Sequence, residues 1–378
     1  MICVTSSNKK IIHIMPDEKF NDMAIRQFEN AASGIHEYWI LTSNKLVTYT
    51  KSSLIKIGSF DQIKHELTRK EVSAIFFHSL PLTCYPLLEN IPQGKKVFWF
   101  GWGADYYFML PYDLYLPQTL SSIRSTLKSK LKVSVKNILQ RFGLMPLSKS
   151  KSLRRIDYFS PVLDIEFQMV VQHTPHLSKA QYICWNYGTV EDDLSASDAA
   201  SILGDNILAG NSASATNNHI ELFYTIKEQV DLNGRSVVVP LSYGDKKYKD
   251  LILIEGRKIL GDSFLPLTDY MEKDKYIQTI QSCGFVAMNH MRQQAVGNAC
   301  ISMLMGAKIY LNEKNPLYRW LHLRGAHIGT LEKIDMKPLS IDQQECNRQI
   351  VYNHWGRKAQ AEKTRHVIDT ALNDWISA

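Results

Sequence analysis

Residues 284–316, GFVAMNHMRQQAVGNACISMLMGAKIYLNEKNP, decide the predicted fold. The apolar run 285–288 is typical of a buried strand, and a polar turn follows it. Residues 295–305 are almost all apolar and include no proline, which predicts a buried helix that ends at Gly306. Residues 308–311 predict the next strand. Such a strand–turn–helix–strand unit normally closes as a right-handed crossover in a parallel sheet.

The polar turn of this unit carries Arg292, Gln293 and Gln294. In parallel α/β units, the free N–H groups and the positive dipole end of the helix face the ligand side of the sheet. A guanidinium adds a fixed cation with a fork of donors that suits phosphate oxygens. We therefore predict that this turn holds a diphosphate.

The rest of the chain alternates strand and helix patterns around this unit. Because 378 residues exceed the size of a single growing core, two domains are expected. The acidic and small-residue segment 190–201 is the best linker. The sequence predicts an α/β protein of two doubly wound, Rossmann-like domains facing across a cleft, with the ligand at the carboxyl ends of the strands. The predicted boundaries are 1–189, 190–345 and a C-terminal helical segment, 346–378.

Composition narrows the class of protein. Hydrophobic residues make up 45% and charged residues 21% of the chain, as in a soluble globular protein. The six cysteines are scattered without a metal-binding spacing, which favours reduced thiols. The sequence shows neither a signal peptide at its start nor an apolar run of membrane-spanning length. We expect a cytoplasmic protein, or one attached to the inner face of a membrane.

The net charge of +7 comes from one segment, residues 121–156, which holds ten basic residues and no acidic one. Its first part has apolar residues at helical spacing, so it predicts a basic amphipathic helix of the membrane-surface kind. Lys128, Lys130, Lys132 and Lys136 would face anionic lipid. A solvated helix packed on its own domain explains the pattern equally well. Nucleic-acid binding is disfavoured, because no aromatic interleaving or known motif accompanies the charges.

A second polar turn, 210–219, is expected at a strand end before a helix. Gly210 lets the backbone approach a ligand, and Asn211, Ser212, Asn217 and His219 supply small polar groups. Simple helix capping is the alternative for Ser212 and Asn217. The chain has no GxxxxGK[ST] or GxGxxG loop and no DxD motif. A bound diphosphate would then rely on a cation and a helix N-terminus, without a metal.

The segment GWGADYY, residues 101–107, forms the other dense group of polar and aromatic residues. A carboxylate among aromatic rings has its pKa raised by desolvation, which suits a general base. Asp105 is therefore the favoured base for an acceptor hydroxyl, and His78 is the second candidate. Helix capping by Asp105 and a structural role for His78 are the alternatives. The acceptor would contact Trp102, Gly103, Tyr106 and Tyr107.

Six segments together resemble glycosyltransferase family 56. They are FHS (77–79), FWFGWGADYY (98–107), ILAGNSASATNNH (207–219), VVVPLSYG (237–244), RQQAVGNAC (292–300) and LNEKNPLYRW (311–320). The resemblance implies a GT-B fold, no metal requirement, a dTDP-sugar donor and an acceptor on an undecaprenyl diphosphate carrier. The family's known activity transfers 4-acetamido-4,6-dideoxygalactose in enterobacterial common antigen synthesis.

The sequence thus predicts a peripheral-membrane hexosyltransferase of O-antigen, lipopolysaccharide or common-antigen assembly. The predicted donor-binding residues are Gly210, Asn211, Ser212, Asn217, His219, Pro240, Tyr243, Arg292, Gln293, Gln294, Gly297 and Asn298, and Arg292 would also act in catalysis. The alternatives are a GT-B-like nucleotide-sugar epimerase or phosphorylase that works without lipid, and a non-catalytic binding subunit. The two sugars, their linkage, the stereochemical outcome and the oligomeric state stay open.

Overall fold

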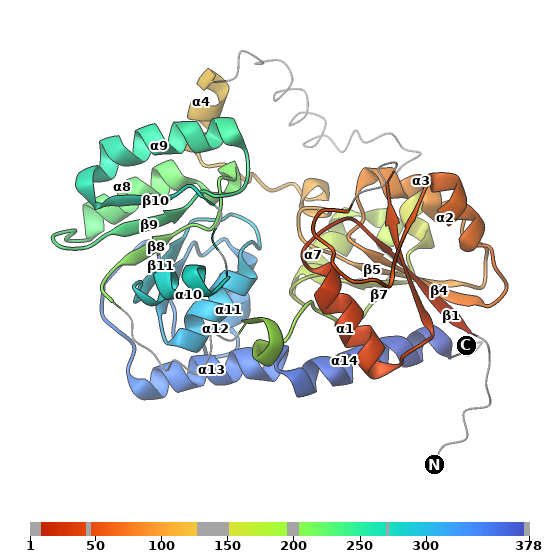
Figure 1. Ribbon diagram of the computed structural model, residues 1–378. Helices are drawn as coiled ribbons and strands as arrows, with labels where there is room; N and C mark the ends of the chain where they lie inside the picture. The colour runs from red at the N-terminus through yellow and green to blue at the C-terminus, as the bar shows by residue number, and fades with distance from the viewer. Residues whose placement is uncertain are drawn as a thin grey trace. The chain divides into compact units, whose positions relative to one another are not determined.

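The computed structural model describes residues 9–42, 47–126, 151–194, 204–269, 271 and 273–373. The chain forms two compact units, each built on a parallel sheet (Figure 1). The first unit comprises the described residues up to Pro111, those from Lys151 to Asp193 and those from Trp355 onward. The second comprises the described residues between these parts. Two Rossmann-like α/β domains confirm the predicted fold class.

The sheet of the first unit has the strand order β3-β2-β1-β4-β5-β6-β7, and every pairing is parallel. The order reverses between β1 and β4, which defines the point where ligands bind in such sheets. The strands are β1 (Lys10–Met15), β2 (His36–Leu41), β3 (Ile55–Gly58), β4 (Val72–His78), β5 (Lys96–Phe100), β6 (Tyr158–Ser160) and β7 (Gln181–Tyr182).

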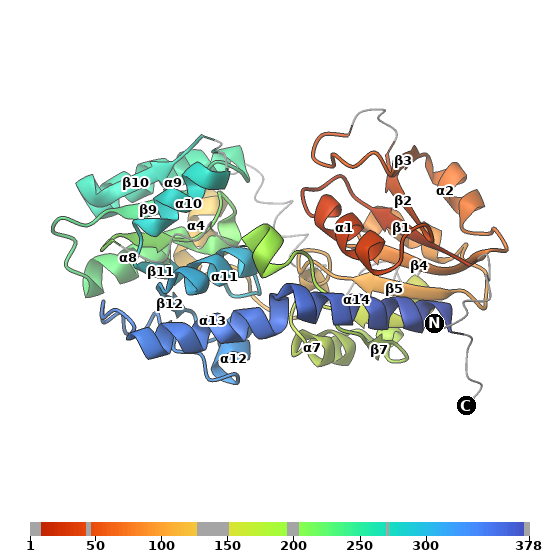
Figure 2. The same cartoon turned by 60° about the horizontal axis from the view of Figure 1, so that its bottom comes forward.

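Helices cover both faces of this first sheet. On one face, α1 (Asn21–Ala31) and α14 (Arg357–Leu372) lie side by side (Figures 1 and 2). They close a core rich in aromatic rings, among them Phe28, Phe76 and Trp185. The remaining helices of this unit are α2 (Phe60–Glu66), α3 (Tyr85–Leu88) and α7 (Glu166–His173).

The sheet of the second unit is also parallel, with the order β10-β9-β8-β11-β12-β13. Its order reverses between β8 and β11, so the loops after these two strands flank the expected ligand position. The strands are β8 (Ile207–Ala209), β9 (Val237–Pro240), β10 (Phe264–Leu267), β11 (Phe285–Met288), β12 (Lys308–Leu311) and β13 (Gly329–Thr330).

In the second unit, α8 (His219–Gln229) and α9 (Lys246–Leu260) pack on one face of the sheet. Figure 1 shows α10 (Lys273–Gln281), α11 (Val296–Met305) and α12 (Pro316–His322) on the other face. The predicted strand–turn–helix–strand unit is present as β11, α11 and β12. Gly306, at φ 90°, ends α11 as a left-handed residue.

The compact units differ from the predicted domain boundaries. Residues 112–126, including α4 (Pro117–Thr126), belong to the second unit because Thr119 and Ile123 contact α8 and its core. Helix α14 belongs to the first unit because it covers that sheet. Sequence reasoning also missed α7 and the first turn of α13 (Ile341–Trp355), whose remainder falls in the predicted C-terminal helical segment.

The basic segment is only partly visible. The predicted membrane residues Lys128, Lys130, Lys132 and Lys136 lie outside the described residues. Among the residues that the structure does describe, none of the helices is long and apolar enough to cross a membrane.

Candidate functional site

The turns after β8 and β11 meet at the reversal point of the second sheet, through side-chain amides. Asn211 Nδ2 donates to the Tyr243 hydroxyl at 2.9 Å, and its Oδ1 accepts from Gln294 Nε2 at 3.0 Å. His290 Nε2 donates to Asn211 Oδ1 at 3.1 Å and to Asn217 Oδ1 at 2.9 Å. All of these residues are buried except Tyr243, which is 53% exposed. The structure therefore brings Asn211, Asn217 and Gln294 together, as predicted for one site.

At Gly210 the backbone lies close to the side chains of Asn217 and His219. The Gly210 φ of 71° lies in the left-handed region, where glycine is favoured. An added Cβ would lie 2.7 Å from Asn217 Oδ1 and 2.8 Å from His219 Nε2. Asn217 also donates to the carbonyl oxygens of Ser212, at 3.1 Å, and Ser214, at 2.9 Å. Neither a larger residue at 210 nor a shifted loop would leave this arrangement intact.

Two helices begin at this cluster, and neither has a side-chain cap at its N-cap residue. These residues are Asn218 for α8 and Ala295 for α11, and both are left-handed, at φ 49° and 59°. Gly297 lies in the first turn of α11, and among the described residues a Cβ there would meet only Leu194, at 4.0 Å. The first turn of α11 therefore has space beside it, with N–H groups and a positive dipole end suited to an anion.

The other predicted donor residues lie around the same turns. Arg292 is half-buried between β11 and α11, and its Nη1 donates to the Gln293 carbonyl oxygen at 3.0 Å. Asn298, on α11, donates to the Tyr276 hydroxyl at 3.1 Å. Pro240 is the last residue of β9. All of the predicted donor residues belong to the second unit.

Two buried histidines stay neutral in this cluster. Burial lowers the pKa of His219 to about 3, and its Nδ1 is 3.1 Å from the Tyr248 hydroxyl. Burial, helped by the positive charge of Arg292, lowers the pKa of His290 well below its ordinary value. Arg292 is therefore the cation that this loop pair provides at neutral pH.

In the first unit, Asp105 ties together the loops that follow β4 and β5. Its Oδ2 accepts from Leu80 N at 2.9 Å and from Trp99 Nε1 at 2.8 Å, and its Oδ1 accepts from Trp102 N at 2.8 Å. The side chain is buried, and burial raises the pKa of its carboxyl while these hydrogen bonds lower it. Asp105 therefore braces the two loops, and its role as a base stays a prediction.

We expect Asp105→Asn to lower the free energy of unfolding by about 1–3 kcal/mol, because an amide NH₂ would face an N–H donor at one oxygen position. Urea unfolding followed by tryptophan fluorescence measures this. Asp113→Asn is the matched control, since Asp113 is exposed. A variant as stable as the wild type would show that the three donors do not depend on a second carboxylate oxygen.

The predicted acceptor residues divide into two groups. Tyr106 and Tyr107 are buried, and both hydroxyls donate to Glu166, a fully buried residue of α7 that sequence reasoning missed. Their hydroxyls thus anchor α7. Trp102 is half-buried, with its ring edge-on to those of Phe20 and Tyr187, and Gly103 follows it at φ 91°. Of the four, Trp102 offers the ring surface that a sugar could contact.

His78 belongs to a buried row of three histidines on the α1 and α14 face. His13 Nε2 is 2.9 Å from His36 Nδ1, and His13 Nδ1 is 2.9 Å from His78 Nε2. The row ends at the Tyr187 hydroxyl, 2.8 Å from His78 Nδ1. Burial lowers the pKa of His36 and of His78 to about 3, and that of His13 well below its ordinary value. His78 is therefore a neutral, fully buried ring, and its catalytic role stays a prediction.

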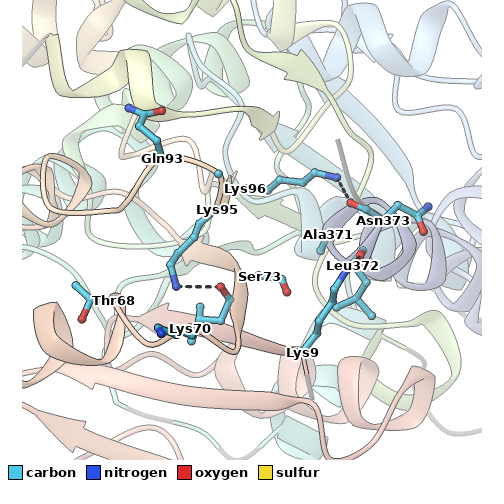
Figure 3. A pocket seen from close by; sticks show the side chains of 12 residues that line it. Lys9, Thr68, Lys70, Ser73, Gln93, Lys95, Lys96, Ala371, Leu372 and Asn373 are labelled. Atoms are coloured by element: carbon cyan, nitrogen blue, oxygen red, sulfur yellow. Dashed lines mark hydrogen bonds between the residues drawn. The ribbon is translucent and has the colours of Figure 1, made fainter. Parts of the chain in front are cut away.

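A pocket of about 480 Å³ lies in the first unit, away from the carboxyl ends of the strands (Figure 3). It is lined by Lys9, Lys70, Lys95 and Lys96 near the starts of β1, β4 and β5. Lys96 Nζ donates to the Thr370 carbonyl oxygen at 2.7 Å, and Lys9 Nζ to the Leu372 carbonyl oxygen at 2.9 Å. These cations cap the C-terminal end of α14. None of the predicted site residues lines this pocket.

Sequence reasoning missed several residues that hold these sites together. Two of them are His13, within the apolar strand β1, and His36, at the start of β2. A polar residue at such a position was the sequence signal that could have found them. Asn218 had no distinguishing signal. Within the described ranges, no group of three or more His, Cys, Asp or Glu side chains is placed to hold a metal ion.

The chain was compared with known families and structures. Residues 164–351 match the model of the family described as 4-alpha-L-fucosyltransferase, glycosyl transferase group 56, which supports an assignment to that group. The region includes the whole cluster around Asn211 and Arg292.

Solved structures show the fold. The OtsA apo structure superposes with a TM-score of 0.65 at 9% identity, covering 97% of this chain and 99% of that one. An E. coli structure described as trehalose-6-phosphate bound with UDP-2-fluoro glucose gives 0.64 at 10% identity, covering 96% and 99%. A UDP-forming trehalose-phosphate synthase from Burkholderia xenovorans gives 0.63 at 9% identity, covering 98% and 100%. These neighbours have the GT-B fold, which is therefore the fold of this chain.

Proposed function

We propose that this protein, a glycosyltransferase with the GT-B fold, takes its sugar from a nucleoside diphosphate bound at the turns after β8 and β11. The observation that carries this is the meeting of Gly210, the Asn211 network and Arg292 at the reversal point of the second sheet. Ligands of doubly wound sheets bind at that point. The match to the glycosyltransferase family covers the same residues.

In the proposed reaction, Arg292 and the first turn of α11 stabilise the nucleoside diphosphate as it leaves. Negative charge grows on the leaving phosphate in the transition state, and a fixed cation with oriented N–H groups lowers its energy. Since these groups supply the positive charge, we propose that no metal is required. The matched family's description names a fucosyltransferase. We accordingly propose a 6-deoxyhexose donor, such as a dTDP-linked 4-acetamido-4,6-dideoxyhexose.

The first unit would bind the acceptor, with the half-buried ring of Trp102 as a contact surface. We propose an undecaprenyl diphosphate-linked saccharide of O-antigen or common-antigen synthesis as the acceptor. Asp105 and His78 are the two candidate bases. Because both are buried, either would need a change in loop conformation to reach an acceptor hydroxyl.

A lipid-linked acceptor places the protein at the cytoplasmic face of the bacterial inner membrane, held by its basic segment. Replacing Lys128, Lys130, Lys132 and Lys136 by Gln should release it from vesicles that contain anionic lipid, at about 1 kcal/mol per charge. Co-sedimentation measures this. Unchanged vesicle binding would show that the segment is a solvated surface.

The donor site is tested by thermal unfolding with dTDP, UDP and GDP, each with and without EDTA. A ligand at 100 times its Kd should add about 2.7 kcal/mol, or about 5 °C or more for a domain of this size. We expect dTDP or UDP to do so in EDTA. Stabilisation by none of the three, or only with Mg²⁺, would contradict the proposal. Turnover of the sugar nucleotide on a soluble saccharide then separates a transferase from an epimerase and from a non-catalytic subunit.

A further inference from the structure

Asn218 holds a segment that lies far away in the sequence against the candidate donor site. Its carboxamide donates to the carbonyl oxygen of Leu114 at 3.2 Å and accepts from the backbone N–H of Leu116 at 2.8 Å. The side chain therefore pairs with the main chain on both sides of Tyr115, as a neighbouring strand would. Asn218 Nδ2 also donates to the Asn289 carbonyl oxygen, at 3.0 Å, in the loop after β11.

A second anchor lies one helical turn further on. The backbone N–H of Thr119 donates to Glu221 Oε1 at 2.8 Å, and its hydroxyl donates to Glu221 Oε2 at 2.5 Å. Thr119 is fully buried, and Ile123 packs against the core of the second unit. Because Asn218 and Glu221 belong to the start of α8, residues 114–123 are fixed to that end of the helix.

Through Asn218, these anchors join the backbone around Tyr115 to Asn289, in the loop that also carries Arg292. Burial raises the pKa of Tyr115, and the positive charge of Arg292 lowers it, so the phenol lies within the electrostatic reach of the guanidinium. Tyr115 in turn contributes to the raised pKa of Tyr248, whose hydroxyl is 3.1 Å from His219 Nδ1. The phenol of Tyr115 therefore interacts electrostatically both with Arg292 and with Tyr248, the partner of the first residue of α8.

We propose that Tyr115 is a further donor-binding residue, whose hydroxyl donates a hydrogen bond to the diphosphate beside Arg292. The inference rests on the proposed donor site of the second unit. A neutral phenol can donate to a phosphate oxygen without competing for the charge that Arg292 supplies, and hydrogen bonds to charged acceptors are strong. Since Asn218 already fixes the backbone on both sides, little conformational freedom is lost on binding.

The test compares Tyr115→Phe, Tyr115→Ala and the wild type by calorimetric titration with dTDP and UDP. We expect Tyr115→Phe to raise the Kd of the nucleotide that the wild type binds by about tenfold or more. This change corresponds to the loss of one hydrogen bond to a charged group. Tyr224→Phe is the matched control, because Tyr224 is exposed on α8. Circular dichroism and the melting temperature without ligand verify the fold.

A double-mutant cycle sharpens the result. If Tyr115 and Arg292 bind the same diphosphate, the double variant should lose less affinity than the two single losses combined. If the two losses of binding free energy simply add, Tyr115 and Arg292 do not bind the same phosphate, and the inference is wrong. Wild-type affinity in Tyr115→Phe would overturn the inference, whether or not Tyr115→Ala is weaker, because the hydroxyl would then have no role. A wild-type protein that binds neither nucleotide would instead overturn the proposed function.

Discussion

Replacing Arg292 by alanine is expected to weaken binding of the nucleoside diphosphate by about 10- to 150-fold. Losing a hydrogen bond to a charged group costs about 1.5–3 kcal/mol, and each 1.4 kcal/mol is a factor of ten in Kd. The other polar groups described for this cluster are neutral amides, hydroxyls and histidines. They orient a ligand without neutralising it. Titration calorimetry with dTDP and UDP measures the change.

The fold should survive this substitution, because Arg292 is half-buried in a turn outside the apolar core. Arg257→Ala is the matched control, since Arg257 is exposed in the last turn of α9. Arg292→Lys keeps the charge but loses the planar fork of donors, and should fall between the wild type and alanine. Unchanged affinity in Arg292→Ala would place the diphosphate elsewhere.

Mild acid is expected to destabilise the first unit steeply. The pKa of an unfolded histidine is about 6.5, whereas His36 and His78 have pKa values of about 3 in the folded state and that of His13 is also lowered. The folded unit therefore binds fewer protons than the unfolded chain. The contribution of these histidines to the free energy of unfolding is therefore fully present above pH 6.5, and it is lost as the pH falls toward 3.

Each such group contributes about 0.7 kcal/mol per pH unit at pH 6.5 and about 1.4 at more acidic pH, so the row contributes about 2 kcal/mol per unit at pH 6.5 and about 4 below pH 5.5. Urea unfolding at pH 7.5, 6.5 and 5.5, followed by tryptophan fluorescence, measures the slope. Glu37, whose pKa is lowered to about 2, acts in the same direction but only in more acidic solution. Replacing His36 by Gln should remove about a third of the slope. His65→Gln, at an exposed position, should remove none.

A pH-independent unfolding midpoint between 7.5 and 5.5 would contradict this account, because it would require the rings to be protonated in the folded unit. The second unit should show a smaller slope of the same sign. It contains two such histidines, His219 and His290.

The elements of the sheets were predictable from sequence because their patterns are local. β11 and β12 have the bounds that the sequence predicts, 285–288 and 308–311. Helix α13 was predicted only from residue 346 onward, because its apolar residues do not form the regular stripe on which the prediction relied. Boundaries between units depend on distant contacts such as Thr119 with Glu221, which no local pattern contains.

In the candidate sites, too, local patterns were predictable from sequence and distant contacts were not. Gly210, Asn211 and Gln294 were predictable because each follows a strand end, and topology brings such ends together. The partners of Asp105 and Tyr106 were not predictable, since burial and hydrogen bonding decide whether a polar group faces a ligand or the interior. Tyr115 could not be found because its neighbours are about 100 positions away in sequence.

The return of the chain to the first unit has a consequence for the order in which the protein matures on the ribosome. Val367, Ile368 and Ala371 of α14 cover the same face of the first sheet as Phe28 and Phe76. That face therefore stays open while every residue from 112 to 354 is being synthesised. The second unit, completed earlier, can fold before the unit that precedes it in sequence. Until α14 emerges, the part of this face that α14 covers is exposed apolar surface, which is prone to aggregation during folding.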